Sequence, residues 1–442
     1  MPRQAHLPSD KGSFKTAAAV RDEAHHNGQP VNEYSGSLCV PCKGTKLLCG
    51  KDRCPLLVKY HARMRTFTLL DRTDLQGTSP PSVFVGSYGY PKVAIGPLVP
   101  PMKGDTALLD QPERWLGRTI DEIVDFRSQL VRGMHTVHIM DVEGGGRIAE
   151  LTREMALAND PTDADVLFSK RPQGNITLND EVQPHGPSAP LKALDIGSLK
   201  IDHRIEKATN DTDWKAREAV NSLYRSGIPV SKLQRCFSVG AFGIEKNRRY
   251  VPTRWSITAV DSTLGEEYMK EVKRFPLINE FRIYETQSLD NRWEVLMLPT
   301  SWRYELMEAW YPNTVWNPMG RSIVLIGDHE GYHGRNTYAS IGGCYYAARL
   351  AVSEHLTKER RQAGVTILRE AHPGYIMPVG VWNVRENVRA ALRAKPLTFA
   401  TMAELLEHVS TKMDIPLSRW IRRSNIIHDM LYQRRIEDFS GA

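Results

Sequence analysis

The sequence predicts a mixed α/β protein, with an α+β arrangement of strands and helices in two globular domains. Its 442 residues, of which 41% are hydrophobic and 25% charged, are enough for two or three domains of about 150 residues each. Segments with strand and helix character alternate along the chain without a detectable repeat. A segment dense in tryptophan and proline, residues 299–318, separates two such regions and marks the expected domain boundary.

Segments with alternating apolar and polar residues, rich in β-branched side chains, are predicted to be strands. They are residues 82–85, 93–95, 136–140, 166–169, 254–260, 281–284, 293–298, 322–326 and 366–369. We expect 281–284 and 293–298 to pair as a hairpin.

Apolar residues at helical spacing predict the helices. These are residues 110–134, 147–157, 214–225, 265–274, 338–363, 384–393, 402–409 and 417–433. Trp302, Leu306 and Trp310 recur every fourth residue, which predicts one face of a further helix that packs into the core.

The chain divides into five predicted parts. The first is too poor in apolar side chains to fold alone, and the last is expected to be exposed. The parts are a flexible leader (1–36), a four-cysteine metal motif (37–62), an N-terminal α/β domain (63–310), a C-terminal α/β domain (311–432) and a tail (433–442).

Bulk charge and hydropathy exclude few functions. The net charge of +7 is mild for this length and does not by itself indicate a nucleic-acid partner. No apolar stretch approaches the roughly 18 residues that a membrane-spanning helix needs. The first thirty residues lack the apolar region of a secretory signal. We therefore expect a cytoplasmic protein without membrane contact.

Four of the six cysteines, Cys39, Cys42, Cys49 and Cys54, lie close together with the spacing C-x2-C-x6-C-x4-C. In a reducing compartment such a cluster indicates metal binding rather than disulfide bonds. Four thiolates suit a tetrahedral zinc ion in a closed structural site. Because a proline follows Cys54, an iron–sulfur cluster is the alternative, and a third interpretation is four reduced cysteines without metal.

The C-terminal tail matches the pattern Q-x-x-h-x-x-a-a of peptides that bind the replicative sliding clamp, PCNA. Ile436 and Phe439 are expected to enter an apolar pocket from one tight helical turn, while the Gln433 amide fixes the register. Ser440 stands where a second aromatic residue is common, so the isolated peptide should bind weakly.

Several sequence blocks together carry a family resemblance. They are residues 39–44 (CVPCKG), 48–50 (LCG), 54–55 (CP), 81–86 (PSVFVG), 89–91 (GYP), 251–261 (VPTRWSITAVD) and 378–387 (PVGVWNVREN). Over residues 37–442 the sequence resembles the archaeal Nre family of DNA repair proteins. This resemblance implies a repair factor with an N-terminal four-cysteine motif and a C-terminal clamp-binding peptide, and it identifies no catalytic residue.

Charged residues in or near the two longest blocks are the candidates for functional chemistry: Arg254, Asp261, Arg369, Glu370 and Arg385. Guanidinium groups at the ends of strands or helices can hold phosphates, which favours contact with DNA. The alternative is a metal- or nucleotide-dependent enzyme acting on nucleic acid, in which these side chains would converge in one pocket. A third interpretation is an internal network of ion pairs.

Overall fold

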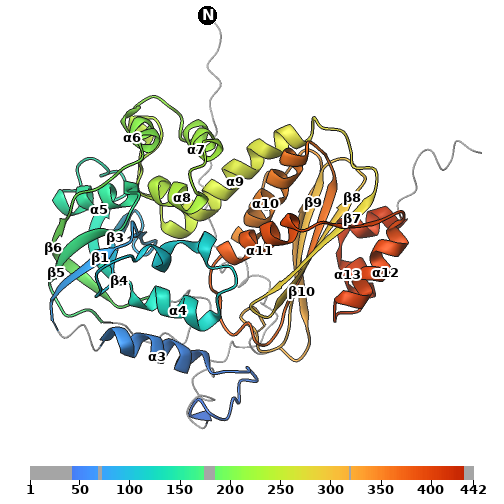
Figure 1. Ribbon diagram of the computed structural model, residues 1–442, viewed down its shortest axis with the longest axis horizontal. Helices are drawn as coiled ribbons and strands as arrows, with labels where there is room; N and C mark the ends of the chain where they lie inside the picture. The colour runs from blue at the N-terminus through green and yellow to red at the C-terminus, as the bar shows by residue number, and fades with distance from the viewer. Residues whose placement is uncertain (1–41, 68–71, 174–184, 318–319, 433–442) are drawn as a thin grey trace, which may run out of the picture.

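The computed structural model describes residues 42–67, 72–173, 185–317 and 320–432 (Figure 1). Two six-stranded sheets, each with helices packed against it, make up the fold. This architecture confirms the predicted mixed α/β class.

The first sheet has the strand order β1-β5-β6-β4-β3-β2. Its strands are β1 (Asp74–Ser79), β2 (Val83–Val85), β3 (Lys92–Val99), β4 (Val131–His138), β5 (Thr162–Phe168) and β6 (Ser188–Ile196). Neighbouring strands are antiparallel except β4 and β6, which are parallel. The helices of this half are α3 (Pro55–Phe67), α4 (Ile120–Gln129), α5 (Arg147–Leu157), α6 (His203–Asn210), α7 (Ala216–Arg225) and α8 (Val230–Ser238).

The second sheet has the order β10-β9-β11-β8-β7-β12. Its strands are β7 (Phe281–Ser288), β8 (Asn291–Leu298), β9 (Arg303–Trp310), β10 (Val324–Glu330), β11 (Gly364–Ala371) and β12 (Leu397–Phe399). Strand β11 is parallel to β9 and antiparallel to β8. The accompanying helices are α10 (Gly343–Glu359), α11 (Trp382–Arg393), α12 (Met402–Lys412), α13 (Leu417–Arg423) and α14 (Asn425–Tyr432).

Helices cover both faces of the second sheet, as the two sides of β8 illustrate. Trp293, Val295 and Met297 pack in one core with residues of α10 and α11. Leu296 and Leu298 face the opposite way and pack with α12, α13 and α14 (Figure 1). Because successive side chains of a strand point to opposite faces, the run of apolar residues in β8 serves two cores at once.

Helix α9 (Thr253–Val272) joins the two halves of the molecule (Figure 1). Val260 and Leu264 belong to the core of the first sheet. Met269 and Val272, nearer its C-terminus, belong to the core of the second sheet. One continuous helix therefore contributes to both cores.

The predicted strand at residues 254–260 is wrong, because these residues form the first two turns of α9. Its alternating pattern, with the β-branched Ile257, Thr258 and Val260, favours a strand locally. Packing of α9 between the two sheets overrides that preference, since a 20-residue helix buries residues against both cores.

The predicted helix at Trp302, Leu306 and Trp310 is also wrong, although all three side chains are buried in the core as expected. Leu306 and Trp310 lie in β9, which begins at Arg303, directly after Trp302. A spacing of four residues is even, so it also places side chains on one face of a strand, where the period is two. The spacing therefore indicated burial but did not distinguish a strand from a helix.

Three predicted helices extend well beyond the real ones. The helix predicted at 338–363 is reduced to α10 at 343–359. The helix predicted at 110–134 is reduced to α4, and β4 follows after a single residue. The helix predicted at 417–433 is divided into α13 and α14 at Ser424, whose hydroxyl accepts a hydrogen bond from the Ile427 amide. The predicted hairpin is confirmed, because β7 and β8 pair antiparallel through a turn in which Leu289 and Asp290 have positive φ.

The predicted limits of the domains stay predictions. Strand β9 ends at Trp310, the predicted boundary, and pairs with β10 beyond it. The leader at 1–36 and the tail at 433–442 lie outside the described residues. Within the described ranges, no helix combines the length and apolar character that crossing a bilayer requires.

Candidate nucleic-acid interface

Two of the five candidate residues, Asp261 on α9 and Arg385 on α11, form a buried ion pair. The Arg385 Nη1 atom lies 2.9 Å from each carboxylate oxygen of Asp261. The Gln234 side chain donates a further hydrogen bond of 3.0 Å to the same carboxylate. Burial raises the pKa of Asp261, and the charge of Arg385 opposes that shift. The pair is fully enclosed and joins two helices.

The Asp261–Arg385 pair continues into a larger network. Arg385 Nε lies 3.2 Å from Glu386, which also accepts a 2.8 Å hydrogen bond from Arg389. Arg389 in turn donates to Glu354 of α10 at 2.9 Å and to the Tyr224 hydroxyl of α7 at 2.7 Å. These charges satisfy one another, so the network holds α7, α9, α10 and α11 together and offers no free group for chemistry.

Arg369 lies in a second buried site, inside the second sheet. Its Nη1 atom is 2.7 Å from Glu308 and its Nε is 2.9 Å from the Asn291 side-chain oxygen. Three aromatic rings contact its guanidinium carbon: Trp293 at 4.6 Å, Trp310 at 4.8 Å and Tyr375 at 5.3 Å from the ring centroid. Arg369 is thus completely partnered within the core.

Glu370, the next residue of β11, points to the other face of the sheet. Its carboxylate accepts hydrogen bonds from the amides of Asp414 and Ile415, at 3.1 and 2.8 Å. Within the described residues, Glu370, His372 and Asp414 are the group whose potential metal-ligand atoms lie within 4.8 Å of one another. Asp414 already pairs with Arg292 at 2.5 Å, so the group ties the loop before α13 to the sheet.

Arg254 is the fifth candidate and lies on the surface, in the first turn of α9. Three aromatic residues near it are also exposed: Tyr338 to 57%, Tyr90 to 47% and Trp255 to 42%, and Tyr88, two residues before Tyr90, is exposed to 97%. The Tyr90 and Trp255 rings contact each other, with centroids 5.3 Å apart. We call these five residues the Arg254 surface.

Tyr338 belongs to the Arg254 surface although it is distant in sequence. Partial burial raises the pKa of its hydroxyl, while a hydrogen bond with Thr258 and the charge of Arg254 lower it. Both partners are in the first turns of α9, so the Tyr338 ring lies beside the start of that helix.

Four of the family blocks, at residues 81–86, 89–91, 251–261 and 378–387, meet at this same place. In the first, the Val85 amide donates a 3.0 Å hydrogen bond to the Thr253 hydroxyl, which begins α9. A Cβ atom on Gly343, at the start of α10, would lie 3.1 Å from Thr258 and 3.2 Å from Val381 of the last block. Glycine at position 343 thus lets α9, α10 and the chain before α11 approach closely.

Helices α9, α10 and α11 all begin here, and none of them has a side-chain cap on its first amides. Helices α9 and α10 are parallel, because Gly343 faces Thr258 and, seven residues later in each helix, Gly265 faces Leu350. The partial positive charges of helix N-termini attract anions. Three such termini therefore add positive potential next to Arg254.

A cavity of about 370 Å³ opens beside the segment that leads into α9. Its walls include the rings of Phe237 and Phe242, and Lys215, Arg249 and Val251 also line it. Val251 lines the cavity and belongs to the same sequence block as Arg254 and Trp255.

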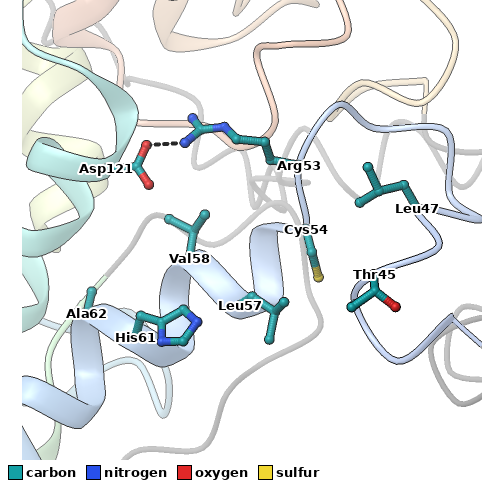
Figure 2. Close-up of a pocket in the computed structure, with 10 residues that line it drawn as sticks. Thr45, Leu47, Arg53, Cys54, Leu57, Val58, His61, Ala62 and Asp121 are labelled. Atoms are coloured by element: carbon teal, nitrogen blue, oxygen red, sulfur yellow. Dashed lines mark hydrogen bonds and ion pairs between the residues drawn. The ribbon is translucent and has the colours of Figure 1, made fainter.

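The cysteine segment forms a separate region, and Figure 2 shows a cavity of about 340 Å³ there. Cys54 and His61 line this cavity together with the loop residues Thr45 and Leu47. The sequence analysis did not single out His61, which lies two turns after Cys54. Cys39 lies outside the described residues, as do the clamp-binding residues Gln433, Ile436 and Phe439.

Cys42 has an environment that stabilises a thiolate. The backbone amide of Leu48, helped by those of Gly44, Lys46 and Leu47, lowers the pKa of its thiol. Amides directed at a cysteine sulfur suit a metal-bound thiolate, whose charge they offset. Cys42, Cys49 and Cys54 are the described members of the predicted set, and no disulfide links them.

The fold and these sites define a two-sheet α/β protein with a cysteine-rich N-terminal segment and an exposed cationic and aromatic surface. Comparison with known sequences assigns the family. The family model described as "Archaeal Nre, N-terminal" matches residues 48–317, and "Archaeal Nre, C-terminal" matches residues 330–439. The chain belongs to the archaeal Nre family, which confirms the resemblance seen in its sequence blocks.

Three relatives are similar over most of their length. DNA repair protein NreB of Archaeoglobus fulgidus is 39% identical over 88% of this chain and 96% of its own. DNA repair protein NreA of the same organism is 37% identical over 85% and 94%. DNA repair protein NreA of Haloferax volcanii is 33% identical over 83% and 89%. No solved structure matches the chain.

The sequence analysis missed the aromatic part of the Arg254 surface. Trp255 lies inside the block at 251–261, and Tyr90 lies inside the block at 89–91, so a signal was present. Tyr338 carries no such signal. Its place beside α9 follows only from the folded chain.

The Asp261–Arg385 pair generates a prediction about stability. Asp261→Asn leaves the buried Arg385 with Glu386 as its remaining acidic partner, and loss of one member of a buried pair typically costs about 3–5 kcal/mol. We expect a loss of roughly 3 kcal/mol in unfolding free energy, measured by urea denaturation.

The matched control is Glu267→Gln on the same helix, which removes an exposed pair with Lys270 and should cost less than about 1 kcal/mol. Replacing both partners, as in Asp261→Leu with Arg385→Met, should restore part of the stability, because no unpaired charge remains. Wild-type stability for Asp261→Asn would contradict the structural role.

Proposed function

We propose that this protein is a DNA repair factor that contacts DNA through the Arg254 surface and docks on the sliding clamp PCNA through its C-terminal tail. One observation carries the DNA contact. Of the five charged candidates, Arg254 is exposed and forms no ion pair with the described residues, whereas the other four are buried and partnered.

The chemistry of the Arg254 surface supports a phosphate-bearing partner. Arginine binds phosphate through charge and directed hydrogen bonds, and contacts to phosphate supply much of the affinity of DNA-binding proteins. The N-termini of α9, α10 and α11, which have no side-chain cap, add to the attraction. The names of the relatives, all DNA repair proteins, agree with this partner.

The arrangement of the candidates gives the enzyme alternative no support. A catalytic site would need Arg254, Asp261, Arg369, Glu370 and Arg385 to face one pocket. Instead Asp261 and Arg385 bond each other, and the neighbours Arg369 and Glu370 face opposite sides of a sheet. The five side chains therefore do not face one common pocket.

Docking on PCNA through Gln433, Ile436 and Phe439 is supported by the peptide pattern. The C-terminal family model extends to residue 439 and so includes all three positions. Two apolar side chains three residues apart and one amide are the contacts that such a pocket needs.

The N-terminal motif is proposed to hold a structural zinc ion through Cys39, Cys42, Cys49 and Cys54. The lowered pKa of the Cys42 thiol supports this proposal, because zinc binds thiolates. A bound zinc ion would join the loop around Cys42 to the start of α3 at Cys54 and so stabilise a segment that has little core of its own.

The DNA contact predicts a salt-dependent affinity. Arg254→Ala should weaken DNA binding by the full-length chain and reduce the slope of log affinity against log salt by roughly 0.7–0.9, the value for one lost phosphate contact. Fluorescence anisotropy with labelled oligonucleotides measures both quantities. Arg118→Ala, at an exposed arginine elsewhere in the chain, is the control, and equal effects of the two substitutions would contradict the site.

The clamp contact predicts a large effect of tail substitutions. Ile436→Ala with Phe439→Ala should weaken PCNA binding at least tenfold, because burial of each side chain contributes roughly 1.5–3 kcal/mol. Isothermal titration calorimetry with the intact protein measures this, with Glu437→Ala as the control inside the same tail. Ser440→Phe should strengthen binding by adding the missing ring. Unchanged affinity of the double variant would refute docking through the tail.

The metal proposal predicts about one zinc ion per chain in protein purified without oxygen. Elemental analysis should find zinc in the wild type and lose it in Cys42→Ser, while Cys344→Ser, at a cysteine in α10, retains it. The protein should have no visible absorption band. If the analysis finds iron and acid-labile sulfide instead, the zinc proposal is wrong and the motif holds an iron–sulfur cluster.

A further inference from the structure

We propose that the Arg254 surface binds unpaired nucleotides of a single DNA strand, with bases stacked on Tyr90, Trp255 and Tyr338 and phosphates beside Arg254. This inference rests on the proposed DNA contact and specifies which form of DNA the surface recognises.

The first argument is the exposure of the aromatic rings. Side chains of this size are normally buried, and a group of exposed ones marks an interaction site. Here Tyr90, Trp255 and Tyr338 lie at the first turns of α9, and Tyr88, two residues before Tyr90, has almost its whole side chain in solvent. Aromatic faces on a protein surface are the platforms on which bases of single strands stack.

The second argument is the arrangement of the Tyr90 and Trp255 rings. Their planes are tilted by 51°, so neither ring covers the face of the other. Each ring keeps part of its surface open, the two rings support each other, and the Val85–Thr253 hydrogen bond joins the end of β2, five residues before Tyr90, to the start of α9. The rings are therefore held in place before any ligand binds, which lowers the entropy cost of stacking.

The third argument is the position of positive charge relative to the rings. Arg254 directly precedes Trp255, and the start of α10 lies beside Thr258, one turn further along α9. Arg254 and Trp255 are both exposed in the first turn of α9, so a phosphate at one and a base at the other would belong to the same stretch of strand. Alternation of cationic and aromatic groups suits the alternation of phosphates and bases in an unpaired strand.

A cavity of about 370 Å³ is lined by Val251, in the segment that leads into α9, and supports the same inference. This volume lies in the range of roughly 300–1,000 Å³ that is typical of ligand pockets. Its Phe237 and Phe242 walls suit a flat base, and Lys215 and Arg249 suit the attached phosphate. Only a base that is free of its partner strand can enter such a cavity.

Duplex DNA would use this surface poorly. In a duplex the bases are stacked on one another and only their edges are accessible. The exposed rings would then contact the backbone without stacking, and Arg254 would supply most of the attraction. The surface should therefore prefer a single strand over a duplex of equal length.

The test uses the full-length protein and two labelled DNA probes at one salt concentration, a thymine single strand and a hairpin duplex. We expect tighter binding to the single strand. Trp255→Ala and Tyr90→Ala should each weaken single-strand binding by about 5- to 100-fold and change duplex binding less than about twofold. Trp255→Phe should keep part of the affinity, because a ring remains.

The control is Tyr332→Ala, at a ring exposed to 42% like Trp255 but placed beside Lys273, beyond the C-terminal end of α9. It should change neither affinity, and circular dichroism should show equal thermal unfolding for all variants. Equal affinity for the two probes, with no effect of the aromatic substitutions, would overturn the inference. The proposed DNA contact would survive that result if Arg254→Ala still weakened binding, and would fail with it if neither probe bound.

Discussion

The ion pair between Asp261 and Arg385 is the interaction on which the arrangement of this protein depends. It lies where α9 meets α11, and Gln234 of α8 completes the hydrogen bonding of the carboxylate. Two full charges are stable in this dry environment only because each has its partner in place. Because each buried charge needs the other, the pair holds α9 against α11. Helix α9 in turn contributes to the cores of both sheets.

The position of α9 in turn builds the exposed surface. Parallel packing of α9 and α10 needs a residue without a side chain at Gly343, where Thr258 and Val381 approach. The same packing brings the starts of three helices to one place and leaves Arg254 at its edge. Buried charges thus hold the scaffold, and an exposed charge remains for a partner. Arg254 and Asp261 therefore have different roles although they belong to the same sequence block: Arg254 is exposed, and Asp261 is buried in the ion pair.

The Arg254 surface combines residues from separate parts of the chain. Arg254 and Trp255 lie in the first turn of α9, whereas Tyr88 and Tyr90 lie between β2 and β3, and Tyr338 precedes α10. The buried network holds α9, α10 and α11 together, so the helices next to these residues are fixed before a partner binds.

The sequence by itself determined the α/β class, the β7–β8 hairpin, the family and the burial of Trp302 and Trp310, because these depend on composition, local periodicity and extended blocks of residues. Only the tertiary structure decided that residues 254–260 are helical, since packing against two sheets outweighs a local strand preference. The tertiary structure also decided which charged side chains are exposed and which are buried in ion pairs or hydrogen bonds. Asp261 and Arg385 are 124 residues apart, and nothing in the spacing of a sequence reports which distant charge lies within 3 Å of another.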